Sequence, residues 1–403
     1  MSIEKKEKGL ITNNEVVIPP AIIKYMGSKR ELIKFVVDGI RDIHQGELIC
    51  DLFAGTAIVG ACLKNDAQIW SNDIQAYSEF FAKSYLDFDP KKFDEKILTD
   101  ISKIAEEHVT DIKRTTSLVE KHYKDELTLT EFQSIEQQQQ GLINSDFTNV
   151  DFHLFSKYYS GTYWSFEQCA WIDGYKKASE RYNNESVQPI IMSSLMHAMA
   201  YNAQSTGHYA QYRDANKVDS MKDIIIYRRK SIKEYFERKF VELSSKLEGN
   251  KKKNFHSSLD YKECLTRIPD GSLVYADPPY NFVHYSRFYH AIETLVKYDY
   301  PEIKFKGRYR TDRHQSPFCQ KTNVKKAFIR MFEITSSKRL KLVLSYSNNG
   351  LITFDSIVDL AKKSTKGYDI KIKQQSYVHS TMGRSEDKSR NVKEILITLT
   401  PSI

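Results

Sequence analysis

The hydrophobic and polar positions near the beginning of the chain alternate between helical and strand-like patterns. Apolar residues recur with helical spacing over residues 32–40, directly after a Gly-Ser turn. Two short apolar runs follow at residues 48–52 and 67–72, and each has the length of a buried strand. The small and apolar residues between these runs predict a helix. The three segments together predict a strand–helix–strand unit.

The pattern changes after residue 88 and changes back after residue 254. Residues 89–254 are polar and mostly helical in pattern, whereas four strand-like runs lie beyond residue 271. The last two runs are close in sequence and predict an antiparallel hairpin. A lone strand–helix–strand unit buries too little apolar surface to be stable. We therefore expect segments 1–88 and 255–403 to form one α/β sheet around a helical insertion; the alternative is two unrelated domains flanking a third.

The composition is that of a water-soluble globular protein. Of the 403 residues, 40% are hydrophobic and 28% are charged. No apolar run approaches the ~18 residues of a membrane span. The N-terminal stretch is charged without an apolar signal region, and the five cysteines form no Cys-x-x-Cys pair. These features predict a cytoplasmic protein in a reducing environment, with no membrane partner, zinc site or disulfide framework.

The charge of the chain changes this picture only a little. A net charge of +8 is a weak indication of a polyanionic partner, and solubility explains it equally well. Two basic stretches with interleaved aromatic residues, 227–240 and 305–315, are typical of surfaces that grip a nucleic-acid backbone. The distribution of charge therefore favours a nucleic acid as partner.

Candidate ligand-binding residues follow the first two predicted strands. In open α/β sheets a ligand lies outside the carboxyl ends of the strands. Gly55 follows the first strand and lets the backbone approach a ligand, and Asp73 follows the second, where an acid can hold ribose hydroxyls. Either residue alone is also typical of an ordinary loop. Ala57 stands where a dinucleotide fingerprint has its next glycine, which argues against a nicotinamide cofactor.

The most specific signal is the tetrapeptide Asp277-Pro278-Pro279-Tyr280, which follows a buried strand-like run. Two adjacent prolines cannot donate hydrogen bonds to a sheet, so the strand must stop there. The aspartate side chain and a proline carbonyl can both accept hydrogen bonds from one amino group, and the tyrosine offers a face for stacking. We interpret this turn as a grip on the exocyclic amine of a flat heterocycle. The alternative is a rigid turn with Tyr280 packed in the core.

Such a grip has a chemical consequence. Acceptors that bind the hydrogens of an aromatic amine push electron density back toward its nitrogen. The nitrogen can then attack an activated methyl group in line, without a covalent enzyme intermediate, and positioning and electrostatics carry the rate. A base in a duplex must leave the helix to reach the site. The turn therefore predicts methyl transfer to a flipped base.

Several motifs, in this order along the chain, resemble those of the DNA-adenine methyltransferase family. They are KYMGSK (24–29), DLFAGT (51–56), Asp73, the acid of SLDYKECL (258–265) and the Asp-Pro-Pro-Tyr turn. The segment that ends in KEILITL is also similar to family C-termini. Ala57 departs from the final glycine of the family's Phe-x-Gly-x-Gly motif. The resemblance covers the two flanks, whereas the insertion matches only loosely.

The resemblance implies a Rossmann-like sheet of the S-adenosylmethionine-dependent methyltransferases, with a C-terminal antiparallel hairpin and a helical target-recognition domain inserted at 89–254. It implies S-adenosylmethionine as cofactor and no metal. Its implied catalytic residues are Asp277, Pro278, Pro279 and Tyr280. Its implied cofactor-binding residues are Tyr25, Lys29, Asp51, Phe53, Gly55, Thr56, Asp73, Asp260 and Asp277.

Candidate DNA contacts lie in the insertion and after the catalytic motif. Gln204 and Arg213 belong to a stretch of glycines, aromatics and amides, and such side chains can read adenine and guanine edges. Packed turns explain the same stretch. The candidate phosphate contacts are Arg308, Arg310 and Arg313, with a solvated loop as the alternative.

The sequence thus predicts a site-specific adenine methyltransferase acting on double-stranded DNA, with a cognate restriction endonuclease as a candidate partner. A methyltransferase acting on RNA or on protein amines is one alternative, because related turns serve there too. The long insertion argues for duplex recognition. A non-catalytic DNA-binding subunit is the other alternative, and the intact Asp277 and Tyr280 argue against it.

Overall fold

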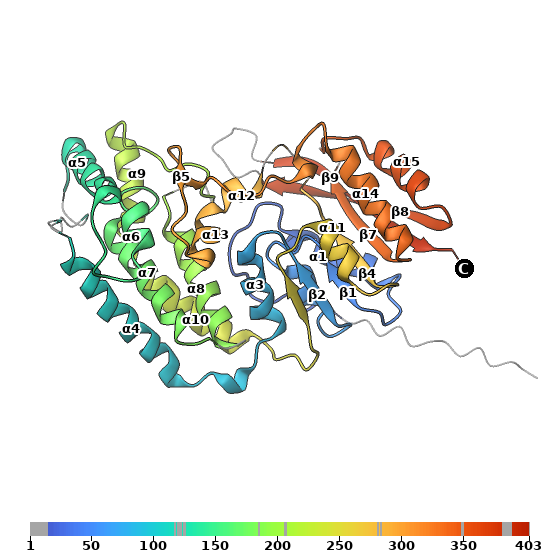
Figure 1. Cartoon of the computed structure of the whole chain (residues 1–403), viewed down its shortest axis with the longest axis horizontal. Coiled ribbons are helices and arrows are strands. Elements are labelled where there is room, and N and C mark those ends of the chain that lie inside the picture. The colour runs from blue at the N-terminus through green and yellow to red at the C-terminus, as the bar shows by residue number, and fades with distance from the viewer. Residues whose placement is uncertain are drawn as a thin grey trace, which may run out of the picture.

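The computed structural model describes most of the chain. The described residues are 15–402 without 117, 119–122, 124–125, 184–185, 205–207, 280–281, 283, 348–349 and 381–388. Within them, a seven-stranded mixed sheet forms the larger α/β part of the molecule (Figure 1). No described helix is both long and apolar enough to cross a lipid bilayer.

The sheet joins the two flanks of the chain, as the sequence predicts. Five strands run parallel, and the last two form an antiparallel hairpin at one side. The spatial order is β3 (Phe255–Ser257), β2 (Ile69–Asn72), β1 (Ile49–Asp51), β4 (Leu273–Ala276), β7 (Lys341–Ser347), β9 (Ser389–Pro401) and β8 (Tyr368–Ser380). The α/β fold class and the C-terminal hairpin are confirmed. The sequence patterns missed β3, because it has three residues and lies at the sheet edge with Phe255 exposed.

Helices cover both faces of the sheet, which explains why its central strands β1 and β4 are buried throughout. All four residues of β4 are buried. One face packs against α1 (Ile33–Arg41), α2 (Ile58–Leu63) and α3 (Ala76–Leu86), and η1 (Lys29–Leu32) contacts α1 and α2. The other face packs against α11 (Tyr261–Arg267), α14 (Val324–Ser337) and α15 (Phe354–Ser364).

The segment between β2 and β3 is helical beyond α3, in agreement with the pattern of its sequence. Its helices are α4 (Glu95–Arg114), α5 (Leu129–Gln140), α6 (Leu154–Tyr158), α7 (Phe166–Glu180), α8 (Val187–Asn202), α9 (Val218–Arg228) and α10 (Ile232–Lys246). Two of them begin with a capping box, in which Thr128 pairs with Glu131 and Ser165 with Gln168. Helix α8 packs against α3, so one continuous core extends from the sheet into the helical segment.

A short segment after β4 lies between the sheet and the helical segment (Figure 1). It contains α12 (Tyr285–Phe288), α13 (His290–Lys297) and a two-stranded ribbon of β5 (Ile303–Lys304) and β6 (Tyr309–Arg310). Helix α13 packs against α3 and against β6. The catalytic turn predicted at residues 277–280 is therefore followed by structure that contacts both parts of the molecule.

Candidate active site

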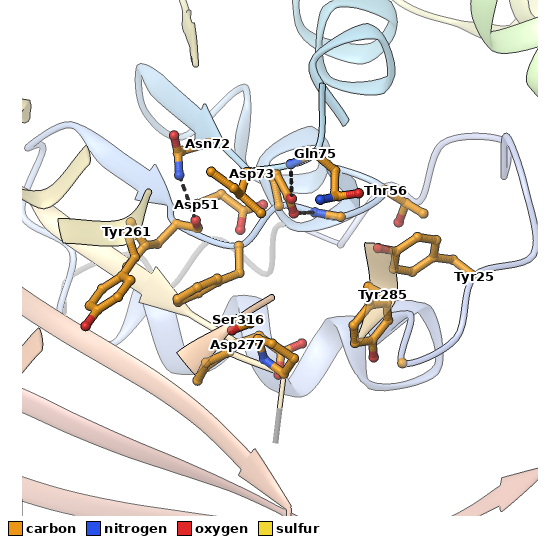
Figure 2. Close-up of a pocket in the computed structure, with 18 of the residues that line it drawn as sticks. Tyr25, Asp51, Thr56, Asn72, Asp73, Gln75, Tyr261, Asp277, Tyr285 and Ser316 are labelled. Atoms are coloured by element: carbon orange, nitrogen blue, oxygen red, sulfur yellow. Dashed lines mark hydrogen bonds between the residues drawn. The ribbon is translucent and has the colours of Figure 1, made fainter. Parts of the chain in front are cut away.

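A pocket opens at the carboxyl ends of β1, β2 and β4, where the sequence predicts a ligand. Figure 2 shows residues from widely separated segments around it. Of the sequence-predicted cofactor residues, all nine line this pocket: Tyr25, Lys29, Asp51, Phe53, Gly55, Thr56, Asp73, Asp260 and Asp277. Pro278 and Pro279 line it as well, whereas Tyr280 lies outside the described residues. The fold thus brings the two predicted sets of residues to one place.

The loop after β1 approaches the pocket with its backbone. Gly55 has a φ of +53°, a left-handed conformation that glycine adopts without strain. A Cβ atom at this position would lie 3.2 Å from the Tyr25 ring. Ala57 also has a positive φ, of 57°, directly before α2. The family's glycine would relax this backbone, and alanine tolerates it at a cost of about 1–2 kcal/mol.

Asp73 fastens two loops of the pocket together. Its Oδ2 accepts a hydrogen bond from the Gly55 backbone N–H and its Oδ1 accepts one from Gln75, both at 2.9 Å (Figure 2). Burial raises the pKa of this carboxyl to about 6, and the two backbone bonds oppose the rise. Each oxygen keeps lone-pair capacity for a ligand hydroxyl. The Oε1 of Gln75, which also lines the pocket, is buried without a hydrogen-bond partner in the described structure.

The Asp277 carboxylate forms an ion pair inside the pocket wall. Lys29 Nζ lies 3.1 Å from Asp277 Oδ1 and 2.7 Å from Glu394 Oε1. Burial raises the pKa of Asp277, Lys29 lowers it, and Glu394 raises it further. Lys29 is therefore a neighbour of the predicted catalytic motif, in addition to lining the predicted cofactor site.

The remaining predicted cofactor residues form the floor and the aromatic wall of the pocket. Asp51 is buried, accepts a hydrogen bond from the Gly60 backbone at 3.3 Å, and has its pKa raised to about 7 by burial. Phe53 packs edge-on against Phe318 with ring centroids 5.5 Å apart. Asp260 caps α11 by accepting from the Lys262 backbone N–H.

Tyr25 belongs to a group of nearly parallel rings at one side of the pocket. Its ring centroid lies 4.4 Å from that of Tyr289 and 5.5 Å from that of Tyr285. Its hydroxyl pairs with that of Tyr77 at 2.9 Å. The sequence motif at 24–29 is thereby fixed against α3 and the segment that follows the catalytic turn.

Two of the predicted DNA contacts are placed in the interior. Gln204 is fully buried, and its amide pairs with the backbone of Thr162 and of Arg213. Arg310 is 3% exposed and is held by Asp299 and Asp312. Neither side chain is exposed at the surface where a DNA duplex could contact it. Gln204 lies in a bend after α8 and Arg310 lies in strand β6. Each side chain is engaged in internal hydrogen bonds there, which outweighs the surface role that its residue type suggested.

The other three predicted DNA contacts differ in availability. The Arg308 guanidinium donates to the carbonyls of Tyr158 and Gln140, which leaves little capacity for phosphate. The Arg213 side chain is 32% exposed and only 3.5 Å from Asp223. Arg313 is partly buried, and its Nη1 has no hydrogen-bond partner among the described residues. Arg213 and Arg313 are therefore the predicted contacts whose side chains are least engaged by other residues, although the Nη1 atom of Arg313 is itself buried.

Sequence reasoning missed several residues of the pocket. Tyr285, His314 and Ser316 line it after the catalytic turn, and Glu394 reaches it from β9 through Lys29. The aromatic density after residue 283 was an available signal for Tyr285. The signal for Glu394 was a lone acid directly before an apolar run. This run by itself indicates only a strand that is similar to family C-termini.

The chemistry of the pocket suits a neutral or cationic organic ligand. One buried carboxylate, Asp51, and two partly buried ones, Asp73 and Asp277, face it together with one buried cation, Lys29. Within the described ranges no group of three or more His, Cys, Asp and Glu side chains is arranged to hold a metal ion. A glycine turn, a fastened acid and aromatic walls fit a nucleoside with a charged tail.

Comparison with known proteins assigns the family. Residues 25–347 match the model of the D12 class N6 adenine-specific DNA methyltransferases. The chain is 23% identical over 389 residues to the modification methylase LlaI of Lactococcus lactis subsp. lactis, covering 93% of this chain and 54% of LlaI. It is 25% identical over 355 residues to the type II methyltransferase M.FokI of Planomicrobium okeanokoites, covering 84% and 47% respectively.

A shorter relative is matched nearly along its whole length. The type II methyltransferase M.NlaIII of Neisseria lactamica is 23% identical over 360 residues, which cover 86% of this chain and 90% of M.NlaIII. The chain spans about half the length of LlaI and M.FokI. The family match includes the pocket residues from Tyr25 to the catalytic turn. The chain belongs to the D12 class N6 adenine-specific DNA methyltransferase family.

Proposed function

We propose that this protein transfers a methyl group from S-adenosylmethionine to the exocyclic amino group of adenine, at a specific site in double-stranded DNA. The observation that carries the proposal is the place of Asp277. This acid stands at the carboxyl end of a central strand, beside two prolines and in the same pocket as the glycine turn and Asp73. Acceptor and nucleoside-binding features thus face one cavity, within a family of adenine methyltransferases.

The residues of the Asp-Pro-Pro-Tyr turn bind the adenine amine by hydrogen bonds, and none of them acts as a nucleophile. Lys29 engages Asp277 Oδ1, so Oδ2 is the oxygen that accepts a hydrogen bond from the adenine amino group. A carbonyl of the rigid proline pair accepts the second hydrogen. The nitrogen lone pair is thereby turned toward the cofactor side of the pocket. This use of fixed acceptors in a buried site is electrostatic preorganisation.

The cofactor residues fit S-adenosylmethionine. When bound, it supplies an electrophilic methyl group. Asp73 would accept hydrogen bonds from the ribose hydroxyls, and Asp51 and the loop at Gly55 would face the charged methionine part. Phe53 and Tyr261, whose rings lie 6.3 Å apart, would flank the flat base. Asp260, at the start of α11, would contact the base amine.

Recognition of the DNA sequence is assigned to the helical segment 89–254, with catalytic flanks at 1–88 and 255–403. Arg213 is its accessible candidate for reading a base, and Arg313 is the candidate phosphate contact outside it. The relatives carry names of modification methylases and type II methyltransferases. A cognate restriction endonuclease is accordingly the proposed functional partner, in the cytoplasm where both would meet DNA.

The proposed function is tested by incubating the full chain with labelled S-adenosylmethionine and genomic DNA. We expect label in N6-methyladenine after nucleoside digestion and mass spectrometry, and a discrete sequence motif when the modified sites are read by single-molecule sequencing. Label in N4-methylcytosine, or transfer to RNA in preference to duplex DNA, would contradict the proposal. An active-site variant, Asp277→Ala, is the control for contaminating activity.

Asp73→Asn is expected to weaken cofactor binding. The substitution removes the negative charge but keeps one acceptor for the backbone N–H of Gly55 or Gln75. Loss of charge-assisted bonds to ribose hydroxyls costs about 1.5–3 kcal/mol. Isothermal titration calorimetry of S-adenosylmethionine measures the effect.

The matched control is Asp66→Asn, whose carboxylate pairs with Arg41 outside this pocket. Its cofactor affinity should equal that of the unmodified protein. Since Asp73 has a pKa of about 6, affinity should also fall as pH drops through that value, because protonation removes the same charge. Equal affinities for the Asp73 variant and the control would move the ribose contact elsewhere.

A further inference from the structure

Glu394 is a buried acid in a place where an apolar residue would pack well. It lies near the middle of strand β9, is 0% exposed, and is followed by the buried residues Ile395, Leu396 and Ile397. Replacing a buried ion pair by apolar side chains is often neutral or stabilising. The fold alone therefore does not require a carboxylate here.

The Glu394 carboxylate is fixed by two donors. Lys29 Nζ donates to its Oε1 at 2.7 Å, and the Ser345 hydroxyl, on the neighbouring strand β7, donates to the same oxygen. Its Oε2 has no hydrogen-bond partner within the described part of the chain. The head group is thus oriented by contacts from η1 and from β7.

Lys29 connects this carboxylate to the catalytic turn. The same Nζ atom lies 3.1 Å from Asp277 Oδ1, and both Lys29 and Glu394 are buried. One cation is therefore shared by two carboxylates that come from different strands. With all three groups ionised, the cluster carries one net negative charge in a site of low dielectric constant, where charges act strongly.

We propose that Glu394 is a positioning residue, which holds Lys29 against Asp277 and supplies the second anion that keeps the catalytic turn net negative. The inference rests on the proposed function and deepens it. During methyl transfer the adenine nitrogen gains positive charge, so a net negative surrounding favours the transition state more than the ground state. A Lys29–Asp277 pair alone would be neutral and would lack this preference.

The charged groups around Asp277 give the proposal a specific signature in the pH dependence. Besides Lys29 and Glu394, the titratable groups that interact with Asp277 are Tyr275, on β4, and Asp51, on β1. Asp277 must be ionised to accept from the amine, so activity is lost as pH falls through its pKa. Glu394 raises that pKa and Lys29 lowers it.

Glu394→Gln and Lys29→Met should therefore shift the acid limb of the kcat profile in opposite directions. Removal of the Glu394 charge favours ionised Asp277 and moves the limb to lower pH. Removal of the Lys29 charge disfavours ionised Asp277 and moves the acid limb to higher pH. We expect kcat of Glu394→Gln at neutral pH to fall about 10–100-fold, the range seen when a group that orients an active-site ligand is removed, with little change in either KM.

The experiment measures kcat and KM for both substrates from pH 5 to pH 9, roughly the range over which these carboxyls titrate. Glu394→Asp, which keeps the charge, should recover part of the lost kcat. Glu136→Gln is the matched control, because Glu136 is also a buried carboxylate paired with a buried cation, Arg228, in the helical segment. Its acid limb should coincide with that of the unmodified protein.

An unchanged acid limb in Glu394→Gln would overturn the proposal, since a merely structural role lowers the amount of active protein without moving the limb. If Glu394→Gln does not fold, the comparison is made between Lys29→Met and the double variant Lys29→Met/Glu394→Gln. The double variant should have the lower acid limb, and coincident limbs would overturn the proposal. Failure of the proposed function is a separate result, because the unmodified protein would then show no adenine methylation.

Discussion

We expect Asp277→Ala to abolish the proposed methyl transfer to adenine and to leave the protein folded. The substitution removes the fixed acceptor for the substrate amine, and loss of one such preorganised group lowers kcat by about 10²–10³-fold or more. Folding survives because Lys29 keeps its 2.7 Å contact with Glu394, so no buried cation is left without an anion. Rates of methylation on duplex DNA, together with thermal unfolding, measure both effects.

The same protein sample also provides the internal control. Cofactor binding by calorimetry should be weakened only in part in Asp277→Ala, since Asp277 is one of nine predicted cofactor-binding residues and Asp73 and the loop at Gly55 are untouched. Asp277→Asn tests the charge alone and should be impaired nearly as strongly. Turnover close to that of the unmodified protein in either variant would show that the amine is bound elsewhere.

Arg228→Met lowers the free energy of unfolding by about 3–5 kcal/mol, the cost of leaving one partner of a buried ion pair alone. The Arg228 side chain is 0% exposed, and its guanidinium binds both carboxylate oxygens of Glu136, at 3.0 and 2.5 Å. It also donates to the backbone carbonyls of Thr162 and Tyr163. Urea unfolding followed by circular dichroism gives the measurement.

A surface arginine of the same segment serves as the comparison. Arg213→Ala removes a partly exposed side chain 3.5 Å from Asp223, and such pairs contribute about 0–1 kcal/mol. The double variant Arg228→Met/Glu136→Leu should recover part of the stability, because no unpaired charge remains. A loss below about 1 kcal/mol in Arg228→Met would contradict the buried pair.

The sequence was most informative where local chemistry and strand ends coincide. Gly55, Asp73 and Asp277 each follow an apolar run, and parallel strands bring their carboxyl ends to one edge, so their meeting in the pocket was predictable. The strand–helix–strand unit and the C-terminal hairpin were also predictable, because their apolar residues recur with helical or strand-like spacing. Edge strand β3 did not, because three residues carry no readable period.

The partners of buried polar side chains were not predictable. Gln204 and Arg310 have residue types suited to DNA, yet their burial depends on backbone groups and acids that the local sequence does not reveal. Glu394 is the opposite case: its residue type suggested no role in the site, and its place there depends on Lys29, which is distant in sequence. Such pairings are tertiary facts, and single-sequence patterns report only local ones.

The position of β9 in the chain determines when, during synthesis, Lys29, Asp277 and Glu394 can come together. The ribosome delivers Lys29 before the helical segment, Asp277 only after the whole of that segment, and Glu394 later still. Central strand β1 likewise waits for β4, its neighbour from the far side of that segment. Pairings between such distant segments form slowly. A nascent chain accordingly has its helical segment synthesised before Lys29, Asp277 and Glu394 can come together, so the predicted catalytic turn gains its two charged neighbours only after β9 has joined the sheet.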